Sequence, residues 1–242
     1  MKDSYKMAVI LPVYNESQKI DETLREVIKY SMAHPDYFFL FVDDGSIDNT
    51  FEIIKSAAED LTNVSIIRYP VNRGKGYAVK YGFENISAKY YCFTDSDLAY
   101  PLDLLEIIEE QLTYNHVVIG SRKLFARKRR PNLLRHILGE GYNRIMRVIL
   151  GLSFEDTQAG LKGFTKEVVK TVFPKMTIYG FGFDPEILYI CKRYNFTIKE
   201  IPVMETERHS YNTCKLRLTK DSFRMLRDLF KVRKNGILKR YD

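Results

Sequence analysis

Residues 91–97 read Tyr91-Cys92-Phe93-Thr94-Asp95-Ser96-Asp97, an apolar run that ends in two carboxylates one residue apart. The apolar run predicts a buried strand, and alternate side chains of a strand lie on one face. We therefore expect Asp95 and Asp97 to project together where the strand ends. Close like charges repel unless a cation or a proton relieves them, and Mg²⁺ commonly binds one or two carboxylates together with substrate phosphates. The pair predicts a divalent metal beside a phosphate ester, although Asp-x-Asp also occurs in ordinary loops and helix caps.

The first half of the chain repeats this order of an apolar strand, a polar strand end and a helix. Continuous apolar strands separated by helices are typical of a parallel sheet covered on both faces, in an α/β fold. The helices are expected where apolar residues recur at helical spacing. The predicted strands cover residues 7–11, 38–42, 64–69, 90–94 and 117–119, with Pro12 ending the first, and the predicted helices cover 16–33, 51–58, 76–85 and 102–112.

Polar clusters follow four of these strands, at the edge where ligands bind in open parallel sheets. The clusters are Tyr14-Asn15-Glu16, Asp43-Asp44-Gly45-Ser46, Asn72-Arg73-Gly74-Lys75-Gly76 and Asp95-Ser96-Asp97. Asp43 lies nearest its strand and is the stronger functional candidate, whereas Asp44 and Ser46 are expected to shape the loop. The backbone N–H groups and the cation of residues 74–76 suit a phosphate, although they also fit a plain helix entry.

After Arg122 the pattern changes. Helices are predicted over 133–150, 166–173, 185–194 and 216–232, the last of them amphipathic, with a loop and strand over 154–164 and a strand over 197–203. Two further acids are candidate site residues in this half, Asp156 and Asp184. Asp184 precedes Pro185 at a helix start, so helix capping is an alternative role for it.

The net charge is +7, and the cations are concentrated in two segments. Residues 122–135 contain seven Lys or Arg and no acid, and residues 215–240 are also rich in cations. Such asymmetry predicts an anionic partner, either nucleic acid, an acidic membrane surface or a phosphorylated substrate, unless these segments are only solvated surfaces. No apolar stretch approaches the roughly 20 residues that span a bilayer. The three widely spaced cysteines fit reduced thiols in a cytosolic protein.

In their order and spacing, the motifs resemble those of the family-2 glycosyltransferases with the GT-A fold. The resemblance covers nearly the whole chain and rests on the four strand-end clusters, with Pro12-Val13 before the first, and on Gly120-Ser121-Arg122. It implies a single domain over residues 1–242, with a Rossmann-like, mostly parallel sheet flanked by helices on both faces. Residues 1–121 would bind the nucleotide sugar. Residues 122–242 would bind the acceptor, through the basic segment and a C-terminal amphipathic helix.

Within that family, three later motifs are similar to those of the polyprenyl-phosphate sugar transferases. This group includes the dolichyl-phosphate mannosyl- and β-glucosyltransferases and their bacterial undecaprenyl-phosphate relatives. The motifs are Asp156-Thr157-Gln158-Ala159-Gly160, Phe183-Asp184-Pro185-Glu186, and the stretch from Arg208-His209-Ser210 to Lys215-Leu216. The Asp-Thr-Gln-x-Gly form resembles the glucosyl branch, which uses a UDP sugar. Many members carry membrane helices or a partner subunit, so a partner subunit in the membrane is one expectation for this chain.

The resemblance also implies roles for individual residues. Asp95 and Asp97 match the metal-binding pair, which would hold Mg²⁺ or Mn²⁺. The candidate catalytic residues are Asp97, Asp156 and Asp184. Positions that would bind the nucleotide sugar are Pro12, Tyr14, Glu16, Phe41, Asp43, Lys75, Asp95, Ser96 and Arg122. Positions that would bind the acceptor phosphate are Arg122, Arg135 and Arg208.

Together these roles imply a metal-dependent, inverting hexosyltransferase. The expected donor is UDP-glucose, and the expected acceptor is a polyprenyl or dolichyl phosphate at the cytoplasmic face of a membrane. A phosphate monoester has a second pKa near 6 and is already an anion at neutral pH, so it needs positioning by arginine more than deprotonation. The cationic, amphipathic tail would rest on an anionic bilayer and hold the protein peripherally.

Two alternatives stay open from the sequence. The first is a soluble transferase that extends a polysaccharide or another cell-surface glycan. Its hydroxyl acceptor would need a general base, for which Asp156 or Asp184 could serve. The second is a nucleic-acid-binding module that grips phosphates with its basic segments. Such a module would leave the strand-end acids without a role.

Overall fold

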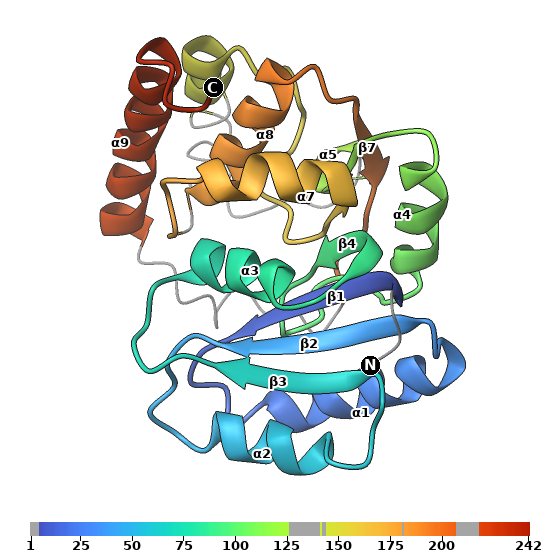
Figure 1. The fold of residues 1–242 in the computed structure, drawn as a ribbon. Coiled ribbons are helices and arrows are strands. Elements are labelled where there is room, and N and C mark those ends of the chain that lie inside the picture. Colours follow the sequence, from blue (N-terminus) through green and yellow to red (C-terminus); the bar gives the residue numbers. More distant parts are fainter. Residues whose placement is uncertain (1–4, 126–140, 142–143, 181, 207–217) are drawn as a thin grey trace.

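A seven-stranded sheet forms the centre of the part of the chain that the structure, a computed structural model, describes: residues 5–125, 141, 144–180, 182–206 and 218–242 (Figure 1). The order of the strands is β3-β2-β1-β4-β6-β5-β7. All run parallel except β6, which lies between β4 and β5 and is antiparallel to both. The mostly parallel α/β sheet expected from the sequence is therefore confirmed. The strands are β1 (Tyr5–Val13), β2 (Tyr37–Asp43), β3 (Val64–Arg68), β4 (Ala88–Phe93), β5 (Val117–Ser121), β6 (Lys162–Thr165) and β7 (Ile198–Pro202).

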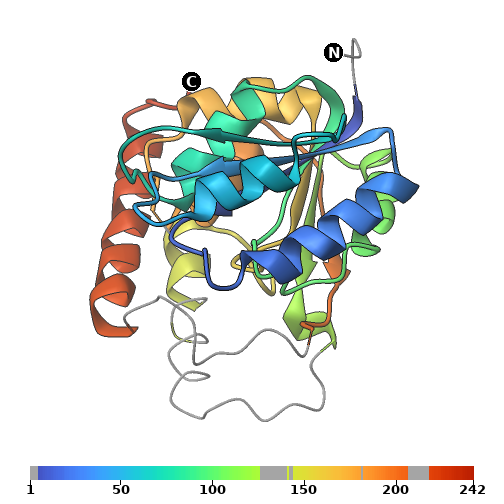
Figure 2. The same cartoon turned by 90° about the horizontal axis from the view of Figure 1, so that it is seen from below.

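Helices cover both faces of this sheet. One face packs against α1 (Ile20–Ala33), α2 (Thr50–Ala57) and α4 (Leu104–Leu112). The other packs against α3 (Lys75–Glu84), α7 (Lys166–Val172), α8 (Phe183–Arg193) and α9 (Leu218–Ile237). Two short elements, α5 (Arg122–Phe125) and the 3₁₀ helix η1 (Phe173–Lys175), and the helical residues 144–150 complete the described set. Figure 2 views the molecule from the side of α1 and α2.

Burial on both faces explains why the strands are continuous apolar runs. Along β1, Met7 and Val9 contribute to the core under α1, whereas Ala8 and Ile10 contribute to the core under α3. A strand covered on both faces, such as β2, therefore needs apolar residues at consecutive positions along its length. This requirement places the polar clusters at one edge of the sheet.

The first strand runs through Pro12 to Val13 rather than ending before the proline, so that expectation is wrong. The N–H of Thr94 donates to the carbonyl oxygen of Ile10, which means that Ile10 faces β4. Pro12 faces the same side as Ile10, because alternate residues of a strand point to the same neighbour. β4 has already ended there, at Phe93. The missing N–H of Pro12 therefore breaks no ladder hydrogen bond.

The amphipathic C-terminal helix is present as α9, and its apolar side is used inside the protein. Leu229 and Val232 are buried in the same core cluster as α8. Phe230 is exposed on the same helix. Within the described residues, no helix has the length and apolar character that crossing a membrane requires.

A buried carboxylate ties the end of the chain to the domain and gives a stability prediction. The Glu186 carboxylate on α8 accepts hydrogen bonds from the N–H and hydroxyl of Thr177, from the N–H of Ile178 and from the hydroxyl of Tyr241. Burial raises the pKa of Glu186, although these hydrogen bonds oppose the shift. We expect Glu186→Ala to lower the free energy of unfolding by about 3 kcal/mol, because several buried donors lose their acceptor at once.

Urea unfolding followed by circular dichroism measures this change. Glu110→Ala is the control, because Glu110 is exposed on α4. We expect that control to change the unfolding free energy by less than about 0.5 kcal/mol. Equal losses in the two variants would contradict the role of Glu186.

Candidate active site

The polar clusters that follow β1, β2 and β3 are joined by hydrogen bonds, as the sequence predicts. The N–H of Asn15 donates to the hydroxyl of Ser46 at 2.9 Å, which links the first cluster to the second. The Asp44 carboxylate accepts from the N–H groups of Arg73 at 2.6 Å and Gly74 at 2.9 Å, which links the second to the third. Asp44 and Ser46 therefore shape the loops of this edge.

The backbone at the start of α3 is occupied by protein contacts. The N–H of Gly74 binds Asp44, and the N–H of Gly76 donates to the carbonyl oxygen of Tyr179 at 2.8 Å. Gly74 has φ of +99°, and a Cβ there would lie 2.6 Å from the same carbonyl oxygen. The expected use of these two N–H groups for a phosphate is thus wrong, and the helix-entry interpretation holds for them. The side chain of Lys75 is what this segment presents to an anion.

The Asp95-Ser96-Asp97 cluster lies in a turn. β4 ends at Phe93, and the N–H of Leu98 donates to the carbonyl oxygen of Asp95 at 3.0 Å. Leu98 has φ of +47°, and the N–H of Ala99 donates to the Asp97 carboxylate at 3.1 Å. The expectation that strand alternation aligns the two carboxylates is therefore wrong, because a tight turn orients them instead.

Asp95 is held between a cation and a glycine. One carboxylate oxygen forms an ion pair with the Lys75 ammonium. The other faces Gly160, where a Cβ would lie only 1.8 Å from it, so any larger side chain there would displace this carboxylate. Burial by itself lowers the pKa of Lys75, but the carboxylates of Asp95, Asp184 and Asp97 outweigh it and keep this pKa above its usual value.

The donor set of this turn fits a hard divalent cation. Asp97 is exposed and Asp95 is partly exposed, so the carboxylates are accessible. Among the described residues, no group of three or more His, Cys, Asp or Glu side chains gathers as a metal site. Mg²⁺ commonly takes one or two carboxylates and completes its coordination with water and substrate phosphates, so Asp95 and Asp97 provide enough protein ligands for it.

A second ion pair lies beside this turn, in the buried interior. The Lys162 side chain is fully buried, and its ammonium donates to the carbonyl oxygen of Ala159 at 2.6 Å and lies 2.7 Å from Asp184. Burial raises the pKa of Asp184, against the opposing effect of Lys162 and Lys75. The N-cap of α8 is Gly182, so the capping role considered for Asp184 is wrong.

Lys162 is a functional candidate that the sequence motifs do not single out. The sequence does contain a sign of its importance, because Lys162 is a charged residue within the apolar run Leu161-Lys162-Gly163-Phe164. A charge in a buried strand requires a buried partner.

A third ion pair joins Arg122 to Asp156. The guanidinium contacts both carboxylate oxygens, at 2.7 and 3.1 Å, and lies 3.3 Å from Glu205. Burial would raise the pKa of Asp156, but the Arg122 guanidinium outweighs it and holds this pKa below its usual range. The two hydrogen bonds to Asp156 therefore fix the orientation of the Arg122 guanidinium. A carboxylate with a lowered pKa is a weak proton acceptor near neutral pH.

The residues expected to hold the nucleotide lie at the ends of β1 and β2, with one exception. Pro12, Tyr14 and Glu16 are partly exposed. Asp43 is buried, and one of its carboxylate oxygens lies 3.8 Å from the Arg68 guanidinium but has no hydrogen-bond partner, so a ligand donor could satisfy it. Phe41 is 0% exposed and packs in the core under α1 and α2, so its side chain is not available to a base and that expectation is wrong.

Of the other expected site residues, the structure describes Ser96 but not Arg135 or Arg208. The hydroxyl of Thr23 donates to the carbonyl oxygen of Ser96 at 2.5 Å, which anchors the turn at residues 95–97 to α1. Arg135 and Arg208, proposed for the acceptor phosphate, lie outside the described residues, as does the basic segment beyond residue 125.

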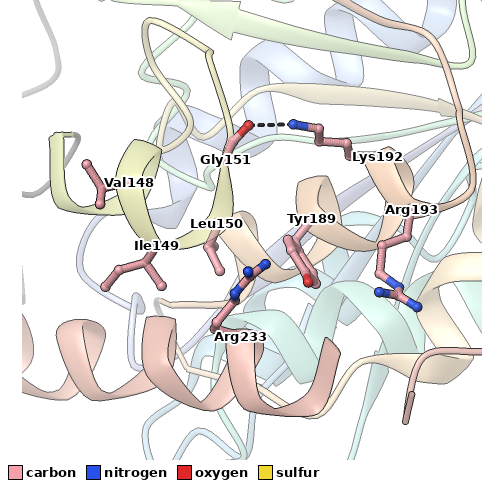
Figure 3. A pocket seen from close by; sticks show the side chains of 8 residues that line it. All are labelled: Val148, Ile149, Leu150, Gly151, Tyr189, Lys192, Arg193 and Arg233. Atoms are coloured by element: carbon pink, nitrogen blue, oxygen red, sulfur yellow. Dashed lines mark hydrogen bonds between the residues drawn. The ribbon is translucent and has the colours of Figure 1, made fainter. Parts of the chain in front are cut away.

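A hollow of about 360 Å³ lies at the opposite end of α8 from Asp184. Figure 3 shows Lys192 and Arg193 of α8 and Arg233 of α9 around it, with the helical residues 148–150 on the other side. Lys192 donates to the carbonyl oxygen of Gly151 at 2.6 Å, and Arg193 pairs with Asp242. The hollow is therefore separate from the strand-end site.

Comparison with known proteins adds three findings. The family model described as "Glycosyl transferase family 2" matches residues 8–173. The chain is 31% identical to a dolichyl-phosphate beta-glucosyltransferase of Trichomonas vaginalis, over 95% of this chain and 73% of that protein. It is 30% identical to the dolichyl-phosphate beta-glucosyltransferase of Saccharomyces cerevisiae, over 94% and 74%.

Among solved structures, the fold is similar to that of glucosyl-3-phosphoglycerate synthase from Mycobacterium tuberculosis, crystallised with Mn²⁺, UDP-glucose and phosphoglyceric acid. The TM-score is 0.71 at 17% identity, and the match covers 95% of this chain and 80% of that one. At this identity the likeness establishes the shared GT-A fold.

Proposed function

The chain belongs to glycosyl transferase family 2 and is a glycosyltransferase, and we propose that it transfers glucose from UDP-glucose to dolichyl phosphate. Relatives at about 30% identity over most of the chain are dolichyl-phosphate beta-glucosyltransferases, which supports the sugar and the lipid. The structural relative bound to UDP-glucose and Mn²⁺ supports the donor and a divalent cation.

One observation carries the choice of a phosphate acceptor: both candidate general bases are already paired with cations. Asp156 holds Arg122, and Asp184, whose pKa is raised by burial, is itself buried and paired with the buried ammonium of Lys162. A hydroxyl acceptor would need one of them free to take its proton, whereas a phosphate monoester is already a nucleophilic anion. The arrangement therefore favours a phosphate acceptor over a glycan hydroxyl.

In the proposed reaction an oxygen of the acceptor phosphate attacks the anomeric carbon as the bond from that carbon to UDP breaks. UDP-glucose is α-linked, so a single displacement gives the β-linked product with inversion. Arg122, oriented by Asp156, contributes a fixed cation for phosphate, and Lys75 contributes one for the leaving diphosphate. A divalent cation bound by Asp95 and Asp97 would neutralise charge on that leaving group.

The proposal also locates the protein peripherally at the cytoplasmic face of a membrane. Support comes from the side of the molecule where α9 meets the helical residues 144–150. Val148 is exposed there near Arg233 of α9, and Phe230 and Lys234 are also exposed on that helix. Exposed apolar groups beside cations suit an anionic lipid surface.

A donor and acceptor screen by mass spectrometry tests the function. UDP-glucose, UDP-galactose and GDP-mannose would each be offered with dolichyl phosphate and, separately, with 3-phosphoglycerate, in the presence of Mg²⁺ or Mn²⁺. We expect dolichyl phosphate to gain one hexose, with UDP-glucose as the preferred donor. Transfer to 3-phosphoglycerate without transfer to the lipid would contradict the proposal.

A further inference from the structure

We propose that Lys75 is the resident counter-ion of Asp95 in the nucleotide-free enzyme, and that it yields this carboxylate to a divalent cation only when a diphosphate receives its ammonium. Metal and nucleotide would then bind synergistically. The inference rests on the proposed function, since it concerns the same donor site.

The contact between these two residues is direct and confined. The Lys75 ammonium is in ion-pair contact with Asp95, and its side chain is only 17% exposed. The ammonium also lies 5.6 Å from the centre of the Phe93 ring. A metal ion at Asp95 would therefore meet a cation that is already in contact with the ligand oxygen.

The charges around Lys75 explain why its ammonium would not leave Asp95 unless another anion received it. Lys75 interacts electrostatically with three carboxylates, those of Asp95, Asp97 and Asp184. Lys162 is the second cation of the group and is paired with Asp184. With all five groups ionised, the cluster has one negative charge in excess. A divalent cation added alone would make it positive, whereas a diphosphate added with the metal restores the balance.

Only the side chain of Lys75 can move. The backbone on either side is fixed, because the N–H of Gly74 binds Asp44 and the N–H of Gly76 binds Tyr179. Lysine carries a compact ammonium on a flexible four-carbon stem, which allows it to change partners without moving the helix. The geometry thus allows exchange between a carboxylate and a phosphate within one site.

Mn²⁺ binding, followed by the electron paramagnetic resonance signal of the free ion, tests this proposal with and without UDP. For the wild-type protein we expect UDP to tighten Mn²⁺ binding by at least about tenfold, a usual coupling between two sites. For Lys75→Gln we expect Mn²⁺ alone to bind about tenfold more tightly than in wild type, and UDP to add less than about threefold. Lys80→Gln, on the same helix beside Glu84, is the matched control and should behave as wild type.

Two outcomes would overturn the role of Lys75: Lys75→Gln binding Mn²⁺ alone as weakly as wild type, or UDP tightening both proteins equally. Lys75→Met serves as a second variant of similar length if the glutamine variant does not fold. Failure of the metal site itself would look different. In that case wild type would bind no Mn²⁺ even with UDP, or Asp97→Asn would leave binding unchanged.

Discussion

Gly160→Ala is expected to lower kcat/KM by about 100-fold or more, because displacement of a reacting group by about 1 Å can cost that much. The added methyl group would lie 1.8 Å from an Asp95 carboxylate oxygen. That oxygen is at the end of a short, partly exposed side chain, which can turn away. The fold should therefore survive, at a cost of about 1–2 kcal/mol in unfolding free energy, while the Asp95 carboxylate, the proposed metal ligand, is displaced.

Steady-state kinetics, Mn²⁺ affinity and urea unfolding measured on the same preparation separate these effects. Gly180→Ala is the matched control, since a Cβ there meets nothing within 4 Å. We expect the control to keep its activity within about threefold of wild type. A Gly160→Ala protein with unchanged Mn²⁺ affinity and unchanged turnover would show that the position of Asp95 does not matter for the reaction.

Asp97→Asn is expected to lower turnover by about 1,000-fold, since a metal ion supplies several kcal/mol of charge stabilisation to a leaving diphosphate. Asparagine keeps an oxygen that can accept the N–H of Ala99, so the turn should persist. Asp97 is exposed, and we expect little change in stability. Asp103→Asn, an exposed acid at the N-cap of α4, is the control. Normal activity in Asp97→Asn would count heavily against the metal assignment.

The fold, and the edge of the sheet that carries the candidate site, can be predicted because helices cover both faces of the sheet. Strands buried in this way are apolar along their length, and their polar residues follow at the strand ends. A strand such as β2 is buried at every position, so its apolar run and its polar end at Asp43 and Asp44 are visible in the sequence. In parallel strands those ends meet at one edge. Hydrogen bonds among Asn15, Ser46, Asp44 and Gly74 bear out that prediction.

The contacts that complete the site depend on where β6 inserts. This strand enters between β4 and β5 in the antiparallel direction, which pairs Lys162 with Phe93. Its approach also brings Gly160 against Asp95. No local pattern encodes that insertion.

Buried and partly buried ion pairs are concentrated around this site, where they are not needed for the core. Removing ions from water costs several kcal/mol for each ion, and apolar residues in their place are often equally stable. The Lys162–Asp184 and Arg122–Asp156 pairs are therefore better explained by fixed charges for a reaction than by stability. Both pairs also keep acids occupied that could otherwise act as bases.

The most direct measurement compares two acceptors that differ only in their phosphate. The protein, with Mg²⁺ and UDP-glucose labelled in the sugar, would be given dolichyl phosphate or dolichol in the same detergent. We expect labelled lipid from dolichyl phosphate, with a β-linked glucose, and no labelled lipid above background from dolichol. Equal or greater transfer to dolichol would mean that a hydroxyl is the nucleophile, and would contradict both a phosphate acceptor and the proposed roles of Arg122 and Asp156.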